Sequence, residues 1–507
     1  MKPLSHPHGG GQYMDFEASG NTHNAGSGAS GASGGSGNGH GNGNGNGNGN
    51  GNGAKRPFSH RFQVPRACER CKRLRRGCSE FRPCLRCINA GLRDQCHPTT
   101  ISYMPVSSPQ DSAAGDHQRL IELLPDHILE YCLQRFFEIL HPTIPLLTAR
   151  YVAQLRHAAQ DPERGLESIC VLAAMSAQVL LQVESSPQEA HPGEAVDNPE
   201  TFGRHLFETA TTIYETTPRR FPPTIETCLF TFFLYACAAR LFHHSQAFRF
   251  LRESTTMVEL FRPPEGDEII QLVYRRLFWV LLISERSHAV RYRRQLTLAI
   301  TDTSPKLDSE DAANAGFWSL ASLFRPLDTF FLALHNREVS STVPTWEALL
   351  SVEAAVDSAM KPGQNLHSTQ KANLHVTQLW LRVIIWQLRL RLGHLVETHQ
   401  QLSLTFRYPI EIARDLVLST HELPLDSFRV HGVGLTEKLY DIASALVDVL
   451  ARVPLTLTNA ARLPVGNSPN DDLEYVKALI RKLPGHATYD DLLDKHMEQA
   501  LRSTDHA

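Results

Sequence analysis

Six of the ten cysteines in this 507-residue sequence lie close together, between Cys68 and Cys96. Their spacing is C-x2-C-x6-C-x5-C-x2-C-x8-C, formed by Cys68, Cys71, Cys78, Cys84, Cys87 and Cys96. The chain opens without a charged segment followed by an apolar one, so we expect reduced thiols rather than disulfides. Clustered thiolates in such a chain are typical of structural zinc, which binds four ligands in a tetrahedron.

The number of cysteines predicts a particular kind of metal cluster. One zinc ion would leave two cysteines unused, whereas two ions require eight ligand positions. Six cysteines fill eight positions only if two of them bridge both ions. A segment of about 30 residues cannot build a sufficient core, so we expect metal binding to supply most of its folding free energy.

The segment around the cysteines is strongly basic. Residues 55–96 contain twelve Lys or Arg and three acidic residues, a net charge of +9, although the whole chain carries −3. A cluster of two Zn²⁺ and six thiolates would carry about −2, so an excess of about +7 would remain. A small basic head before a large acidic body is the charge pattern of a module that meets nucleic acid.

The stretch ACERCKRLRRGCSEFRPCLRC resembles the fungal binuclear zinc cluster transcription regulators across the whole module. The resemblance implies that Cys68 and Cys84 bridge the two ions and that a short helix follows each C-x2-C pair. It also implies that the first helix enters the DNA major groove over a GC-rich triplet, commonly CGG. The side chains expected to face DNA are Lys72, Arg73, Arg75 and Arg76.

The module departs from the family pattern at two positions. Arg75 stands where the family usually has a base-reading lysine, and its planar guanidinium can bond guanine O6 and N7 together. Leu74 and Gly77 occupy positions that are usually basic, so affinity or triplet preference can differ from the family norm. Pro83 is expected to tighten the turn before Cys84. The alternative is a zinc module that only contacts proteins and does not read DNA.

The remainder of the chain reads as all-α. In residues 128–140 the apolar side chains recur at helical spacing, which predicts a helix that begins at Pro125 and ends before Pro142. No convincing strand alternation is found. Further helices are expected at 167–183, 201–215, 224–241, 245–261, 267–291, 314–335, 345–360, 368–397, 410–419, 433–452, 470–483 and 488–501.

Composition divides the chain into four parts. Residues 1–54 are rich in Gly, Asn and Ser, which predicts a disordered tail, and residues 55–100 form the zinc cluster domain. Residues 101–119 contain prolines and serines and are expected to be a linker. Residues 120–507 are expected to form the helical regulatory domain.

Two stretches of this body resemble the fungal-specific regulatory region that accompanies zinc clusters. ILEYCLQRFFEILHPTIPLL starts at Ile128 and includes the His141-Pro142 pair, and RRLFWVLLISERSHAVRYRRQLTL spans Arg275 to Leu298. The latter stretch is more similar to regulators of sugar and starch use than to other branches. From the residues alone, His141 is interpreted as a satisfied loop histidine. The apolar side chains Phe278, Trp279, Leu281 and Leu282 are interpreted as core, as are the isolated cysteines Cys132, Cys170, Cys228 and Cys237.

No enzyme motif is found, because the sequence lacks a GxGxxG after a strand, a P-loop, HExxH and GxSxG. His243 and His244 are adjacent, so on a helix they do not share a face and make a poor metal site. The longest uncharged apolar stretch, Thr227–Ala239, is too short to span a bilayer.

The expected function is therefore that of a nuclear regulator of RNA polymerase II genes whose partner is double-stranded DNA. A small-molecule inducer or the transcription machinery are further possible partners. Residues 97–118 contain no heptad run, so a homodimer is expected to form through the helical body, if at all. The rival interpretation is a regulator that works through protein contacts and whose zinc module is vestigial.

Overall fold

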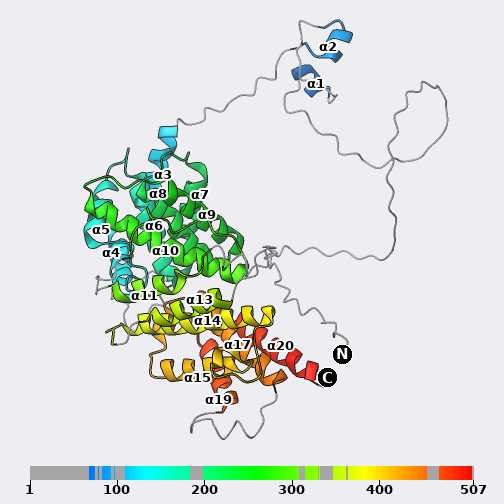
Figure 1. Ribbon diagram of the computed structural model, residues 1–507. Helices are drawn as coiled ribbons and strands as arrows, with labels where there is room; N and C mark the ends of the chain where they lie inside the picture. The colour runs from blue at the N-terminus through cyan, green and yellow to red at the C-terminus, as the bar shows by residue number, and fades with distance from the viewer. Residues whose placement is uncertain are drawn as a thin grey trace, which may run out of the picture. The chain divides into compact units, whose positions relative to one another are not determined.

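The computed structural model describes residues 68–74, 78, 83–92, 96, 109–182, 198–307, 314–328, 331, 346–360, 363–453 and 468–504 (Figure 1). The chain divides into two compact units, Met1–Tyr103 and Met104–Ala507. Within the described residues the regular elements are helices, and an isolated β-bridge joins Val396 and Thr405. The predicted all-α fold is confirmed.

The first unit contains two short helices, α1 (Glu69–Arg73) and α2 (Leu85–Asn89). Each helix begins directly after the first cysteine of a C-x2-C pair and carries the second cysteine within it. Helices of five residues are marginal in isolation because the first turn is costly to nucleate. Their cysteine side chains are buried against one another and form a separate small core.

The first half of the body is organised around α6 (Leu166–Gln182). Every side chain from Ser168 to Leu181 is buried, as expected for a helix that is apolar on all sides. Gly203 of α7 (Pro199–Thr216) allows this helix to approach α6 closely. An added Cβ at Gly203 would lie only 2.9 Å from the Cβ of Leu180. The other elements of this half are α3 (Pro109–Leu123), α4 (Asp126–Arg135), the π-helical turn η2 (Phe136–Leu140), α5 (Ala149–Ala158), α7 (Pro199–Thr216), α8 (Ile225–Arg240), α9 (His244–Leu260) and α10 (Glu268–Tyr292).

The second half is organised around α14 (Ser368–Leu392), which is buried along most of its length. A capping box at His367 begins this helix, and Gly393 ends it with a φ of +72°. Figure 1 shows α13 to α20 grouped beside the group from α3 to α10. The other elements are α11 (Ala315–Phe324), α13 (Trp346–Ser358), the 3-10 turn η4 (Leu402–Leu404), α15 (Tyr408–Thr420), α16 (Asp426–Arg429), α17 (Val433–Arg452), α19 (Pro469–Ile480) and α20 (His486–Thr504).

The helix α10 connects the two halves. It packs against α8, α9 and α11. Arg291 near its end forms ion pairs with Glu437 at 2.9 Å and with Asp441 at 2.6 Å, both on α17. Among the described residues, no helix is both long enough and apolar enough to span a membrane. Thr227–Ala239 lies within α8, a mostly buried helix.

The structure differs from the expected boundaries at the start of the body. Residues 109–119, expected to belong to a linker, form most of α3, and Pro109 is the first residue of that helix. The His117 ring nitrogen bonds the carbonyl oxygen of Ala159 at 2.8 Å, and Leu120 is fully buried. α3 therefore belongs to the core of the body. The predicted tail, 1–54, lies outside the described residues.

Candidate metal centre

The six clustered cysteines lie together in two overlapping groups of four. The groups are Cys68, Cys84, Cys87 and Cys96, and Cys68, Cys71, Cys78 and Cys84. Within each group all sulfur atoms lie within 4.8 Å of one another. Cys68 and Cys84 belong to both groups. The sequence resemblance implied that these two residues bridge the ions.

The distances between sulfur atoms fit tetrahedral metal sites and exclude disulfides. The Sγ atom of Cys68 lies 3.9 Å from that of Cys84 and 3.7 Å from that of Cys87, and the Sγ atoms of Cys71 and Cys84 are 3.7 Å apart. A disulfide requires about 2.05 Å, so these cysteines are free thiols. A tetrahedron with zinc–sulfur bonds of about 2.3 Å has sulfur–sulfur edges of about 3.8 Å. The donor set therefore fits zinc in both type and spacing.

Neighbouring groups lower the pKa of both shared cysteines. Burial opposes ionisation of Cys84, but the backbone N–H of Cys87 and neighbouring thiols lower the Cys84 pKa to about 6. The pKa of Cys68 is lowered in the same way, against burial, by the backbone of Cys71. Burial and the neighbouring sulfurs raise the pKa of Cys87 to about 12.

Backbone groups fix the positions of the sulfur atoms. The N–H of Cys71 donates to the Sγ atom of Cys68 at 3.4 Å, and the N–H of Cys84 donates to the Sγ atom of Cys96 at 3.2 Å. After α2 the chain turns through Gly91, whose φ of +67° favours glycine.

The structure describes only two of the four residues that were predicted to contact DNA, Lys72 and Arg73. Arg73 is exposed at the end of α1, and Lys72 lies in the same helix with a side chain outside the described residues. Arg75 and Arg76 also lie outside the described residues. Leu74 is 48% exposed, so the departure from a basic residue there leaves an apolar side chain on the surface.

Two basic residues beside the cluster were not singled out from the sequence. The Arg70 side chain forms a hydrogen bond with the sulfur of Cys87, which favours the thiolate form of that cysteine. Arg86 is exposed on α2. The signal for both was available, because each lies between the two cysteines of a C-x2-C pair.

The interpretations of the body residues agree with the structure. The four isolated cysteines are buried free thiols, and Phe278, Trp279, Leu281 and Leu282 are each at most 5% exposed. The two stretches that resemble the regulatory region also meet in space. Arg276 of the second stretch donates to the carbonyl oxygen of Pro145 in the first at 3.1 Å.

Comparison with known proteins shows relatives in the fungi. The maltose fermentation regulatory protein MAL13 of Saccharomyces cerevisiae is 22% identical over 424 residues, which cover 76% of this chain and 84% of that protein. The probable sucrose utilization protein SUC1 of Candida albicans is 23% identical over 390 residues, 71% of this chain and 73% of that protein. The respiratory transcription factor ZNF1 of Saccharomyces cerevisiae is 24% identical over 229 residues, 43% of this chain and 48% of that protein.

These relatives and the two overlapping cysteine groups point to the same family. The chain is similar to fungal regulators of transcription and carries clustered cysteines like those of the zinc cluster family that its sequence resembles. No protein-family profile matches the sequence. The relatives are named as regulators and not as enzymes, and the cysteine groups of this chain are suited to binding metal.

Proposed function

We propose that residues 55–100 of this regulator bind two zinc ions and read a GC-rich, CGG-like triplet in the DNA major groove. The helical body then controls the activity of the regulator at RNA polymerase II genes in the nucleus. The observation that carries the proposal is the pair of four-sulfur groups that share Cys68 and Cys84 inside a segment with net charge +9. Such a module has the metal site and the basic surface that a DNA reader needs.

The role of the cysteines is to hold α1 and α2 in one fixed arrangement. The ligands would be Cys68, Cys71, Cys78, Cys84, Cys87 and Cys96. Bound zinc supplies cross-links between thiolates and thereby the folding free energy that so small a core lacks. The buried sulfurs of each C-x2-C pair anchor the helix that contains the second cysteine of the pair, so the basic residues of α1 project from a rigid frame.

Arg75 is assigned the base-reading role, since a guanidinium can donate two hydrogen bonds to one guanine. Lys72, Arg73 and Arg76 are assigned mainly to phosphates, which position the helix without reading sequence. The basic charge of the module supports this division. It also supports fast association, because charge attraction guides a basic module to DNA.

The names of the relatives favour a role in sugar utilisation, since two of those compared are a maltose regulator and a sucrose utilisation protein. If the regulator controls sugar utilisation, a small-molecule inducer is the partner expected to bind the helical body. The transcription machinery is the other candidate partner, and any homodimer is assigned to the helical body. The alternative function is a regulator whose zinc module contacts only proteins.

The decisive experiment is a DNA-binding titration of the full zinc-loaded chain. Fluorescence anisotropy would compare a duplex with one CGG triplet, a duplex with paired triplets and a scrambled duplex of equal length, before and after chelation. We expect preference for the triplet duplexes, loss of binding with chelator and recovery when Zn²⁺ is added back. A metal-loaded chain that binds all three duplexes equally would favour the protein-contact alternative.

A further inference from the structure

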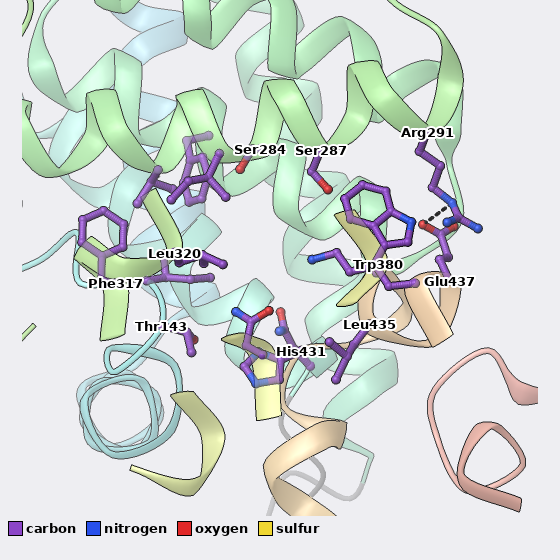
Figure 2. Close-up of a pocket in the computed structure, with 18 residues that line it drawn as sticks. Thr143, Ser284, Ser287, Arg291, Phe317, Leu320, Trp380, His431, Leu435 and Glu437 are labelled. Atoms are coloured by element: carbon purple, nitrogen blue, oxygen red, sulfur yellow. Dashed lines mark ion pairs between the residues drawn. The ribbon is translucent and has the colours of Figure 1, made fainter. Parts of the chain in front are cut away.

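The described part of the body contains a cavity and a surface groove. The cavity, of about 210 Å³, is lined in part by α10, α14 and α17 and includes the Arg291–Glu437 ion pair (Figure 2). The groove, of about 330 Å³, lies between α14 and α15. Exposed side chains border the groove, so another protein molecule can reach it.

The two helices contribute different parts of the groove. Leu379 of α14 is only 3% exposed and gives the groove an apolar base, whereas Leu418 of α15 is 65% exposed and stands at its rim. The other lining residues are His375, Gln378 and Arg382 of α14, and Asp415 and Ser419 of α15. The α14 residues recur at i, i+3, i+4 and i+7, so they share one face of that helix.

The main polar groups of the groove already have partners within the chain. Arg382 pairs with Asp357 of α13 at 2.8 Å and with Asp415 at 3.5 Å. The Gln378 amide donates to the carbonyl oxygen of Val356 at 3.0 Å. A charged or strongly polar ligand would therefore lose its hydration without gaining free partners here. The groove is better suited to an apolar side chain from another protein molecule.

Leu418 is itself such an apolar side chain. The other exposed large apolar side chains in the second half of the body are between 37% and 53% exposed, and they are Leu390, Val396, Leu402 and Leu492. An exposed leucine alone is ordinary on a protein surface. Leu418, however, stands beside a groove with an apolar base, so one patch carries both a protrusion and a hollow. Such self-complementarity is what a two-fold interface requires, because the same surface of each subunit meets its equal.

The charges of the patch also suit a second copy. The body is acidic overall, so two copies repel each other over most of their surfaces. At the groove, however, the guanidinium of Arg382 lies between the carboxylates of Asp357 and Asp415. Charges of both signs within one patch allow an identical patch to approach without strong repulsion.

We propose that the groove between α14 and α15 is the surface through which two copies of this chain pair on DNA. Leu418 of each copy enters the groove of the other. Because Leu418 also lines its own groove, the two leucines meet across the two-fold axis. The inference deepens the proposed function and rests on it, since the pairing serves binding to two triplets.

The pairing is weak in the absence of DNA. Each copy contributes a single highly exposed apolar side chain, so the contact is small compared with a stable dimer interface. Two triplets on one duplex hold the two copies close together and raise their effective concentration. The interface therefore acts mainly as a source of cooperativity on paired triplets.

Sedimentation velocity and anisotropy titration of the full zinc-loaded chain on single-triplet and paired-triplet duplexes test the proposal. We expect two chains to bind the paired duplex cooperatively. Leu418→Asp should reduce this cooperativity about tenfold or more, because the carboxylate would be buried in the partner's groove. Affinity for a single triplet and thermal unfolding should not change, since the side chain is exposed in the monomer. Leu260→Asp is the matched control, because Leu260 is 49% exposed at the end of α9, outside the groove.

A second measurement needs no DNA. Leu418→Cys at high protein concentration is treated with a short bismaleimide, which joins two thiols that come close together. Zinc protects the cluster thiols and burial protects those of the body, so the introduced thiol is the reactive one. We expect cross-linked dimers from Leu418→Cys and none from Leu260→Cys. Because this readout is independent of DNA, failure of the interface is distinguishable from failure of triplet recognition.

Three outcomes would overturn the proposal. Leu418→Asp could bind paired triplets as cooperatively as the unaltered chain. Leu418→Cys could react slowly with a simple maleimide, which would mean that another part of the same chain covers the groove. It could also react rapidly yet form no cross-link, either free or on the paired duplex, which would leave the groove to a different protein.

Discussion

The two shared cysteines differ from the other four in their neighbours. Cys68 and Cys84 each belong to both four-sulfur groups, whereas Cys71 belongs to only one. A backbone N–H and adjacent thiols also favour the thiolate form of both shared residues. The consequence at the scale of single residues is that substitutions of chemically identical side chains should have unequal effects.

We expect Cys84→Ala to lose both zinc ions, because it removes one ligand from each tetrahedral site. Cys71→Ala should retain one ion, since the other group keeps all four of its cysteines. Native mass spectrometry of the full chain counts the ions directly. Cys132→Ala is the control, as its thiol is buried in the body. Retention of one ion by Cys84→Ala would contradict the shared arrangement.

The basic residues predicted to contact DNA should also separate into two classes. Arg75→Ala is expected to relax discrimination at one base pair of the triplet by about 1 to 3 kcal/mol, because bidentate guanine contacts carry specificity. Lys72→Ala should weaken binding to triplet and random duplexes by similar factors, since phosphate contacts do not read sequence. Titrations at several salt concentrations measure both effects. Equal losses on all duplexes for the two variants would refute this assignment.

One motif residue has a structural explanation that the sequence did not provide. The Glu285 carboxylate accepts hydrogen bonds from the backbone N–H groups of Thr297 at 2.7 Å and Leu298 at 2.9 Å, and pairs with Arg252 at 3.1 Å. It thereby holds the loop that follows α10. Glu285 thus ties the following loop to α10 within the stretch that resembles the regulatory region.

At the scale of elements, α3 offers a sharp comparison between two neighbouring side chains. Leu120 is fully buried, whereas Ile121 is 37% exposed on the same helix. Leu120→Ala should reduce the free energy of unfolding of the body by about 2 to 4 kcal/mol through lost burial and a cavity. Ile121→Ala should cost less than about 1 kcal/mol. Chemical denaturation measures both, and equal small effects would mean that α3 does not belong to the core.

Long helices with repeated apolar faces could be predicted from the sequence, and the short or polar ones could not. The helix expected at 433–452 matches α17 at both ends because its apolar residues recur over five turns. α3 begins with polar and small residues, and its stability depends on contacts such as that of His117 with Ala159, far along the chain. Propensity alone cannot reveal such contacts.

The candidate metal site was largely predictable because ligand spacing is local, whereas the cavity in the body was not. The six cysteines and the choice of Cys68 and Cys84 as shared ligands follow from spacing and resemblance. Ser287 and Lys438 lie about 150 residues apart in the sequence and line one cavity only after folding. Two serines one turn apart on the apolar α10 were the only local sign of that cavity.

At the scale of the whole molecule, the position of α3 bears on the oligomeric state. The helix that follows the cluster is buried against α6 and α7, so it is committed to the body and is not a free coiled-coil segment. We expect residues 55–120 to sediment as a monomer and to bind a single triplet weakly. A stable dimer should require the full chain on paired triplets. A stable dimer of the short fragment at micromolar concentration would contradict this.

The reactivity of the ten cysteines toward alkylating reagents can report on the state of the chain. The body thiols Cys132, Cys170, Cys228 and Cys237 are each at most 2% exposed, and burial raises the pKa of Cys132 and of Cys228 to about 12. Alkylating reagents attack exposed thiolates, so these four should react only when the body opens. The six cluster thiols should react as soon as a chelator removes their metal. The number and rate of modified thiols would thus record metal loss and body unfolding as two separate events in one unlabelled molecule.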